Sequence, residues 1–315
     1  MHALRIVFMG TPEFATATLA KLLEQGYTVV GVITAPDRPA GRGRKLQASD
    51  VKKYAVAQGI PVLQPTNLKS ETFLSQLKAL NGKLQIVVAF RMLPKSVWAM
   101  PEFGTFNLHA SLLPDYRGAA PINWAIINGE TETGATTFFI DDTIDTGAII
   151  LQEKTDIHQE DTAGSLHDRL MRLGADLVIK TVELIEKGSA RPKKQKDISF
   201  LKSAPKIHRE TCEIDWEGSL ETIHNQIRGL SPYPTAWTTL VNGDDEILMK
   251  IYRASKEKKQ HGLKTGTIAV EKKDLKIAVQ NGFLHLLEIQ LPGKRKMKTQ
   301  DLLNGFMFEK NAFVR

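Results

Sequence analysis

The chain has 315 residues, of which 42% are hydrophobic and 24% are charged, as is ordinary for a folded globular protein. The length predicts two domains, and the five-residue apolar run near the N-terminus is too short for a secretory signal. Because no run of about 18 apolar residues occurs, we also expect no membrane span. The single cysteine, Cys212, excludes an internal disulfide and favours a cytoplasmic location, where we expect a buried or inert thiol.

The net charge of +7 and the isoelectric point near 9.3 point to a polyanionic partner. The charge is concentrated, because residues 187–209 hold eight Lys or Arg side chains and a single acid, Asp197. Two interpretations stay open on charge alone. The segment is either a solvated linker or a track for nucleic-acid phosphates, in which each basic residue releases condensed counterions.

Strands and helices alternate along the first half of the chain. In chain order, we predict a strand over 4–10, a helix over 11–26, a strand over 27–34, a helix within 45–59, a short extended piece over 60–65, a helix over 70–80, strands over 84–90 and 104–111, a helix over 119–130, strands over 134–142 and 147–155, and a helix over 163–188 that Gly174 would break. Near-continuous apolar strands in such an alternation predict an α/β domain with a doubly wound, mostly parallel, Rossmann-like sheet.

The pattern changes after the basic segment. Residues 214–230 predict a polar turn followed by an amphipathic helix, and short strands follow from Ala236 onward. Asn-Gly pairs at 242–243 and 281–282 indicate hairpins. Short strands at regular spacing predict a small OB-like β-barrel. We therefore divide the chain into a first domain over 1–189, a basic linker over 190–206 and a C-terminal barrel over 207–315.

The stretch FNLHASLLPDYRGAAP, residues 106–121, mixes strand-like residues with strongly polar side chains. Asn107 and His109 are two positions apart on a predicted strand, so their side chains project from the same face. At the carboxyl end of a strand in an open α/β sheet, an amide and an imidazole make a plausible oxyanion site. The alternative is a hydrogen-bonded pair inside the core.

Asp145 lies in the sequence DDTIDTGAII, whose Asp-Thr-Gly triplet is also typical of aspartic proteases. A protease would need a second such triplet from an equivalent lobe or from a dimer, and the chain has no other; the α/β pattern does not fit either. Two interpretations remain for Asp145. It is either the first residue of an Asx turn before a strand or part of a proton relay.

Two loops carry further signals. The loop after the first strand, MGTPEFA, holds one glycine where a dinucleotide fingerprint needs three, so we expect no nucleotide cofactor there. The connection PDRPAGRGRKLQ, residues 36–47, is long for its position and holds Arg38, Arg42, Arg44 and Lys45. We interpret it as a flexible cationic finger for a phosphate-rich substrate, against the alternative of a solvated surface loop.

Together these motifs resemble those of the methionyl-tRNA formyltransferases, a family of folate-dependent formyltransferases. The resemblance covers nearly the whole chain: FNLHASLLPDYRGAAP, then IDTG, the basic 36–47 loop and the late IDW…IHNQIRGLSPYP. The chain departs from the family pattern at Thr143 and at Thr235, where glycine is common.

The resemblance implies 10-formyltetrahydrofolate as formyl donor, initiator methionyl-tRNA as acceptor and no metal. It implies that Asn107, His109 and Asp145 are catalytic. The folate would lie against Phe90, Met92, Ser111, Leu112, Leu113 and Pro114, and the tRNA against Arg42, Arg44, Lys45 and Lys206. We expect a monomer.

Two other functions stay open. A formyltransferase acting on an amino-sugar nucleotide would share the Asn, His and Asp set, although its second domain should differ. A non-catalytic RNA-binding module with a degenerate folate fold is disfavoured, because all three polar residues are present.

Overall fold

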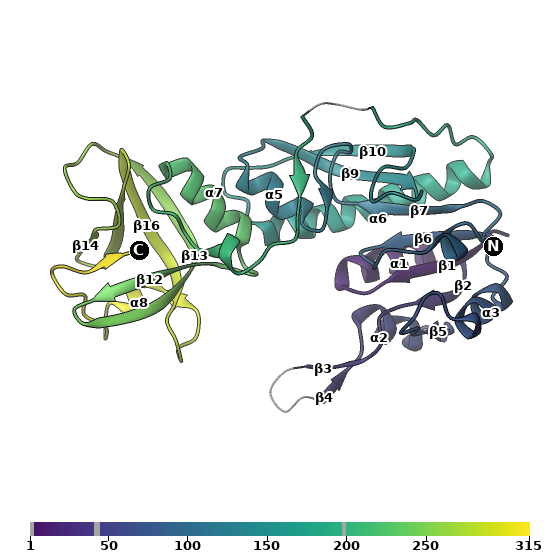
Figure 1. The fold of residues 1–315 in the computed structure, drawn as a ribbon, viewed down its shortest axis with the longest axis horizontal. Helices are drawn as coiled ribbons and strands as arrows, with labels where there is room; N and C mark the ends of the chain where they lie inside the picture. Colours follow the sequence, from purple (N-terminus) through teal and green to yellow (C-terminus); the bar gives the residue numbers. More distant parts are fainter. Residues whose placement is uncertain (1–2, 41–44, 197–199) are drawn as a thin grey trace. The chain divides into compact units, whose positions relative to one another are not determined.

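The computed structural model describes residues 3–40, 45–196 and 200–315 (Figure 1). The chain forms two compact units, and each unit is built from three separate stretches of the sequence. The first holds Met1–Gly118, Thr133–Thr155 and His167–Ser203, and the second holds Ala119–Glu132, Asp156–Leu166 and Ala204–Arg315. Within the described ranges, no helix has the length and apolar character that crossing a membrane requires.

A seven-stranded sheet forms the centre of the first unit, in the order β10-β9-β7-β6-β1-β2-β5 (Figure 1). Parallel pairing joins β1 to β2 and β6, β2 to β5, and β6 to β7, whereas β9 runs antiparallel to β7. The prediction of a doubly wound, mostly parallel sheet is confirmed. The strands are β1 (Arg5–Gly10), β2 (Thr28–Ile33), β5 (Val62–Leu63), β6 (Leu84–Val88), β7 (Thr105–His109), β9 (Glu132–Phe139) and β10 (Ile149–Asp156).

Helices follow most of these strands, and two of them begin after a serine that caps the helix. Ser49 accepts a hydrogen bond from Lys52 N at 3.1 Å, and Ser70 accepts one from Phe73 N at 3.3 Å. The helices are α1 (Glu13–Glu24), α2 (Asp50–Ala57), α3 (Glu71–Ala79), the short α4 (Lys95–Trp98) and α6 (Ala163–Glu186).

The predicted break at Gly174 is wrong, because α6 continues through it for 24 residues. The glycine serves packing instead. A Cβ atom at Gly174 would lie 2.8 Å from Leu108 Cδ2 on β7. A larger residue at this position would need the Leu108 side chain to shift on the strand that carries Asn107 and His109.

The connection over 36–47 reads as a loop in the sequence, but two stretches of it, one on each side of residues 41–44, are paired strands. Strand β3 (Arg38–Ala40) pairs antiparallel with β4 (Lys45–Gln47). Asp37 fixes the base of the hairpin, since its carboxylate accepts hydrogen bonds from Lys52 Nζ at 2.6 Å and Gln64 Nε2 at 2.8 Å. The predicted helix within 45–59 consequently begins only at Asp50.

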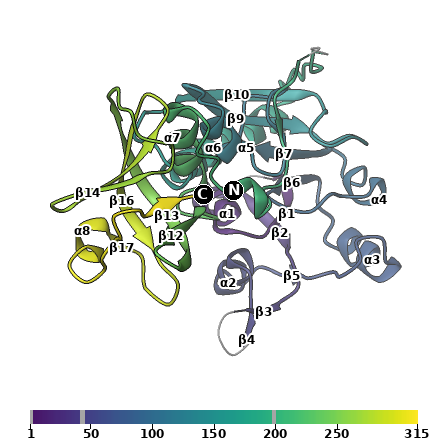
Figure 2. The same cartoon turned by 60° about the vertical axis from the view of Figure 1, so that its left-hand side comes forward.

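The second unit is a β-barrel with helices packed on it (Figure 2). Its sheet runs β14-β15-β16-β13-β12-β18, with β17 beside β16. The two ends of this path meet, because Val314 N donates to Gly266 O at 2.9 Å and Ile268 N donates to Ala312 O at 3.2 Å. The predicted OB-like barrel is confirmed. Its strands are β12 (Ala236–Asn242), β13 (Asp245–Lys258), β14 (Ile268–Glu271), β15 (Asp274–Val279), β16 (Gly282–Gln290), β17 (Met297–Lys298) and β18 (Phe313–Val314).

Helix α7 (Leu220–Leu230) packs on the barrel and on α5 (Pro121–Ile127), which belongs to the same unit. Asn123 Nδ2 donates to the Gly229 carbonyl at 2.8 Å, and a Cβ at Gly229 would lie 2.7 Å from Ile127 Cγ1. The segment 119–132 is therefore held to the barrel unit although it follows β7 in sequence. The remaining short elements are β8 (Arg117–Gly118), β11 (Ser203–Ala204), the 3₁₀ turn η1 (Glu210–Cys212) and α8 (Thr299–Leu302).

His224 on α7 is buried, and its Nδ1 has no hydrogen-bond partner among the described residues. Burial, with nearby Lys256 and Arg228, lowers the pKa of this imidazole, against smaller raising effects of the Ala254 backbone and Glu221. In the unfolded chain the His224 imidazole takes up a proton at a pH of about 6.5, whereas in the folded chain it does so only at lower pH. The free energy of unfolding therefore falls as the pH drops below about 6.5.

Replacing His224 with leucine should remove this part of the pH dependence. Thermal unfolding at about pH 7.5 and about pH 5.5 should show a smaller loss of Tm in the variant than in the wild type. An equal loss in both proteins would mean that His224 does not contribute to acid destabilisation.

Candidate active site

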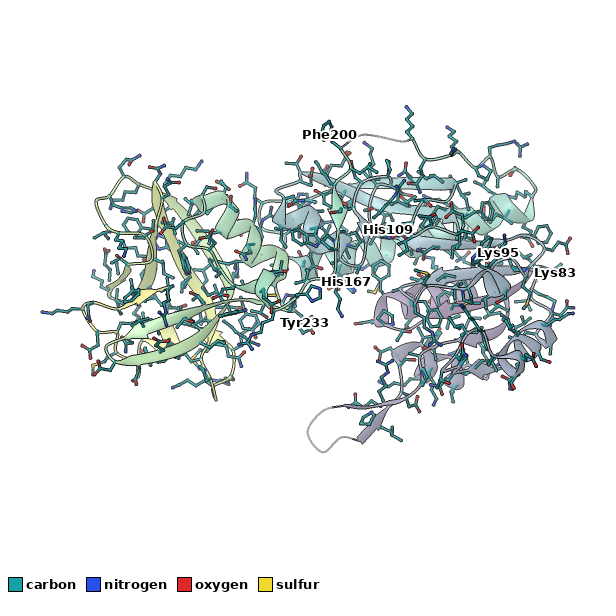
Figure 3. The ribbon with its side chains drawn as sticks, viewed as in Figure 1. Lys83, Lys95, His109, His167, Phe200 and Tyr233 are labelled. Carbon is teal, nitrogen blue, oxygen red and sulfur yellow. The ribbon has the colours of Figure 1, made fainter. Side chains whose placement is uncertain are left out.

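The end of β7 carries the two polar residues that the sequence singled out. Asn107 pairs with Val87 of the parallel strand β6 and with Phe138 of the antiparallel strand β9. His109, the last residue of β7, is 7% exposed, and Asn107 is half-buried. Their two-residue spacing puts both side chains on one face at the carboxyl end of the strand. Figure 3 labels His109 in this unit.

His109 has distinct surroundings at its two ring nitrogens. Nε2 lies 2.8 Å from the carbonyl oxygen of Tyr116, which can only accept, so Nε2 carries a hydrogen and donates it. Nδ1 faces Oδ2 of Asp145 at 3.9 Å. That separation is too long for a hydrogen bond, and the two groups form an ion pair only when the imidazole is protonated. The Nδ1 position is thus the one at which this imidazole can exchange a proton.

Asp145 lies in the loop between β9 and β10 and adopts a left-handed backbone conformation, with φ of 55°. Its carboxylate is 13% exposed and accepts a hydrogen bond from Gly118 N at 3.0 Å. The Asx turn in this loop belongs to Asp141, whose Oδ1 accepts from Thr143 N at 3.1 Å and from Thr146 Oγ1 at 2.9 Å. The interpretation of Asp145 as the turn-forming residue is therefore wrong.

Gly147 completes the Asp-Thr-Gly triplet because the chain passes very close to β9 at this point. A Cβ atom there would lie 1.6 Å from the Phe139 carbonyl oxygen. The backbone of Phe139 also donates to Ala148 O at 3.0 Å. The glycine thus lets the loop turn back against β9 and bring Asp145 over His109.

The loop after β7 is held by its own hydrogen bonds. The Ser111 hydroxyl is fully buried and donates to the Asp115 carbonyl at 2.7 Å. Thr136 of β9 donates to the Ser111 carbonyl at 2.6 Å and accepts from Leu113 N at 3.1 Å. Gln152 Nε2 donates to the Thr136 hydroxyl and to the Leu113 carbonyl, both at 2.9 Å. Ser111 and Leu113 therefore shape the loop.

Among the residues predicted for the folate, Leu112 and Pro114 are half-buried at this loop, whereas Leu113 is buried. The others follow β6, the strand next to β7. Phe90 is half-buried and Met92 is 70% exposed. Because the carboxyl ends of parallel neighbours meet at one edge, these side chains and Asn107 share that edge of the sheet.

Arg91 fixes the segment after β6. Its Nη1 donates to the Thr66 carbonyl at 3.0 Å, its Nη2 donates to the Pro65 carbonyl, and its guanidinium lies 5.5 Å from the centre of the Phe90 ring. Ala89 before it has φ of 47°, in the left-handed region. The strand end is therefore a shaped turn rather than an open extension.

Comparison with known proteins gives the family. Residues 4–182 match the formyl transferase family, and residues 206–307 match the formyl transferase C-terminal domain. A methionyl-tRNA formyltransferase of Flavobacterium johnsoniae is 57% identical over 100% of both chains, and one of Bacteroides thetaiotaomicron is 54% identical over 96% of both. The chain belongs to the methionyl-tRNA formyltransferase family. It is thus an enzyme of the formyl-transferring class.

Solved structures share the fold at lower identity. A sugar 3N-formyl transferase, crystallised in the presence of dTDP and 5-N-formyl-THF, is 22% identical, with a TM-score of 0.65 over 94% of this chain and 100% of its own. HypX from Aquifex aeolicus in complex with tetrahydrofolic acid is 17% identical, with a TM-score of 0.65 over 96% of this chain and 47% of its own. At these identities the likeness concerns the fold.

The residues predicted to contact tRNA are placed less completely than the catalytic set. Arg42 and Arg44 lie outside the described residues, and Lys45 begins β4 of the hairpin. Lys206 is exposed and belongs to the barrel unit. Within the described ranges, no group of three or more His, Cys, Asp or Glu side chains is arranged to hold a metal ion.

Cys212 is buried in the barrel unit, and burial raises the pKa of its thiol. The sulfur donates to the His208 carbonyl at 3.3 Å. A raised pKa leaves little thiolate at neutral pH, so this cysteine is unsuited to nucleophilic attack.

Proposed function

We propose that the chain transfers the formyl group of 10-formyltetrahydrofolate to the α-amino group of initiator methionyl-tRNA. The observation that supports this most is the grouping of Asn107, His109 and Asp145 at the carboxyl edge of the sheet, in a chain that matches its family over its full length. The folate lies against Phe90, Met92 and the loop 111–114, which border the same edge.

The neutral amine of the methionyl ester attacks the formyl carbon, and a carbon–nitrogen bond forms as the carbonyl oxygen takes up negative charge. The Asn107 amide and the Nδ1–H of protonated His109 donate hydrogen bonds to that oxyanion. A well-placed donor of this kind contributes about 3–4 kcal/mol to transition-state stabilisation. Tyr116 holds Nε2 of the same ring, so the imidazole keeps its orientation during the step.

Asp145 moves the proton of the attacking amine toward N10 of the leaving folate. The attacking amine loses a proton to the Asp145 carboxylate, either directly or through a water molecule, as the tetrahedral intermediate forms. The bond from carbon to N10 then breaks, and N10 of the leaving tetrahydrofolate takes up a proton from the same relay. The 3.9 Å between Asp145 Oδ2 and His109 Nδ1 leaves the two groups close enough to share this work without a direct hydrogen bond.

Basic residues bind the tRNA acceptor. We assign the tRNA phosphates to Arg42, Arg44 and Lys45 of the hairpin region and to Lys206, together with the basic linker over 190–206. Paired RNA is read largely by shape and by its 2′-hydroxyl groups. We assign tRNA binding to the barrel over 207–315 and catalysis to the domain over 1–189. We also propose that the enzyme is a cytoplasmic monomer.

An amino-sugar nucleotide is the competing acceptor, because solved structures of sugar formyltransferases share the fold. Their identity to this chain is 22%, whereas methionyl-tRNA formyltransferases match the full chain at up to 57%. The comparison therefore favours tRNA.

Consumption of 10-formyltetrahydrofolate by the purified protein should decide the acceptor. We expect rapid consumption with charged initiator methionyl-tRNA, and only background rates with uncharged tRNA, free methionine or a dTDP-linked amino sugar. Faster consumption with the amino sugar than with the charged tRNA would contradict the proposed function and establish the alternative.

A further inference from the structure

Gln195 is a polar residue of the basic segment whose side chain is nevertheless 6% exposed. Its amide Nε2 donates to the carbonyl oxygens of Asp145 and Gly147, at 2.9 Å each. Its Oε1 accepts from Arg117, at 2.6 Å from Nη2 and 3.2 Å from Nε. One buried side chain thus uses both its donors and its acceptor on two segments of the active site.

These two segments are the ones that set the position of the Asp145 carboxylate. Asp145 has a left-handed backbone conformation, which surrounding contacts must stabilise. The carboxylate itself is bound by Gly118 N, the residue next to Arg117. Gln195 therefore holds the backbone of Asp145 from one side and the segment that binds its carboxylate from the other.

The segment that carries Gln195 is itself fixed to the sheet. Lys193 and Ile149, at the start of β10, exchange both backbone hydrogen bonds at 2.8 Å. The lysines around Gln195 are exposed, namely Lys193, Lys194 and Lys196. Only the Gln195 side chain in this run of four residues is buried. The segment thus has a buried anchoring residue within a basic surface.

We propose that Gln195 is a positioning residue for catalysis: it holds the Asp145 loop and the Arg117–Gly118 segment at the distance that formyl transfer needs. The inference rests on the proposed function. It predicts that losing the Gln195 amide slows the chemical step while substrate binding is kept. A side chain that only contributed to folding would change stability without changing kcat.

The test compares two buried glutamines in the same unit. Gln195→Met keeps the side-chain size and removes all four hydrogen bonds, and we expect kcat for formylation of charged initiator tRNA to fall by about 10- to 100-fold, as for a misplacement of about 1 Å. KM for both substrates should change by no more than about threefold. The control is Gln85→Met. Gln85 lies near the start of β6, away from the carboxyl end of the strand that borders the site, and its side chain accepts a hydrogen bond from Thr105. Losing this bond should lower Tm without lowering kcat.

Gln195→Glu separates the two halves of the contact, because a carboxylate still accepts from Arg117 but cannot donate to the carbonyls of Asp145 and Gly147. We expect its kcat to be as low as that of Gln195→Met. Recovery of wild-type kcat in the Glu variant would overturn the proposal, since only the Arg117 contact would then matter.

A folded Gln195→Met protein with wild-type kcat would also overturn the proposal. If that variant does not fold, Arg117→Met decides, because it removes the anchor of Gln195 and leaves both carbonyl bonds in place. A fall in its kcat of more than about threefold supports the positioning role, and an unchanged kcat contradicts it. A wild-type protein that transfers no formyl group would instead count against the proposed function.

Discussion

Replacing His109 with alanine is expected to lower kcat for formyl transfer by about 100- to 1,000-fold, the usual cost of losing an oxyanion donor or an acid–base group. The imidazole faces the Asp145 carboxylate from the strand end, and its Nε2 donates to the Tyr116 carbonyl. Its loss removes the Nδ1–H donor and leaves Asp145 without its partner.

Asn107→Ala should lower kcat to a similar extent, because it removes the other donor. Steady-state formylation at saturating donor gives both values. His167→Ala is the matched control: this imidazole lies 3.1 Å from Asp168 and stacks edge-on to Phe14 in the same unit, on a helix rather than at the strand end (Figure 3). Equal losses in the His109 and His167 variants would contradict a catalytic role for His109.

Gly147→Ala is expected to be the most damaging single-methyl change near the site. The added Cβ would lie 1.6 Å from the Phe139 carbonyl oxygen, so the loop must move away from β9. Asp145, two residues earlier, moves with it, and a shift of about 1 Å costs about 100-fold in rate. We therefore expect kcat to fall by at least that factor and Tm to fall as well.

Activity and thermal unfolding of Gly147→Ala can be compared with those of Gly262→Ala. A Cβ at Gly262 meets nothing within 4 Å, so the control should keep both wild-type kcat and wild-type Tm. Wild-type kcat in Gly147→Ala would show that the backbone relaxes without displacing Asp145, and would refute the close-approach explanation of the Asp-Thr-Gly triplet.

Local sequence patterns predicted most of the fold, because apolar periodicity and capping residues act within a few positions. Ser70 marks the start of α3 as expected. The hairpins at the two Asn-Gly pairs were also predicted, but with the turn displaced. Asn242 pairs with Asp245, so the turn residues are Gly243 and Asp244. At the other hairpin Gly282 already begins β16, against the Glu257 carbonyl.

Errors arose where distant parts of the chain decide the structure. Gly174 is a poor helix former by propensity, but α6 continues through it, and an added Cβ there would lie 2.8 Å from Leu108 Cδ2. The connection over 36–47 holds Pro36, Pro39, Gly41 and Gly43, a composition that is typical of a loop. Asp37 at the base is bound by Lys52 and Gln64, which no local pattern indicates.

The same limit applies to the candidate site. Asn107 and His109 could be paired from their two-residue spacing, and Asp145 from the resemblance, and the structure brings His109 and Asp145 within 3.9 Å. Thr136 and Gln195 were missed, because each acts through hydrogen bonds to residues far away in sequence. Gln195 lies between Lys194 and Lys196 in the basic linker, and no local signal distinguishes it from these lysines.

Transfer of a labelled formyl group in a single turnover is the sharpest test of formyl transfer to the methionyl amine with Asp145 in the proton relay. Donor carrying label in the formyl carbon is mixed with excess enzyme and charged initiator methionyl-tRNA, and the aminoacyl ester is hydrolysed and analysed by mass spectrometry. We expect the label to appear in N-formylmethionine with the wild-type enzyme, and at least about 100 times more slowly with Asp145→Ala. Release of the label as free formate, or equal rates for the two proteins, would contradict this mechanism.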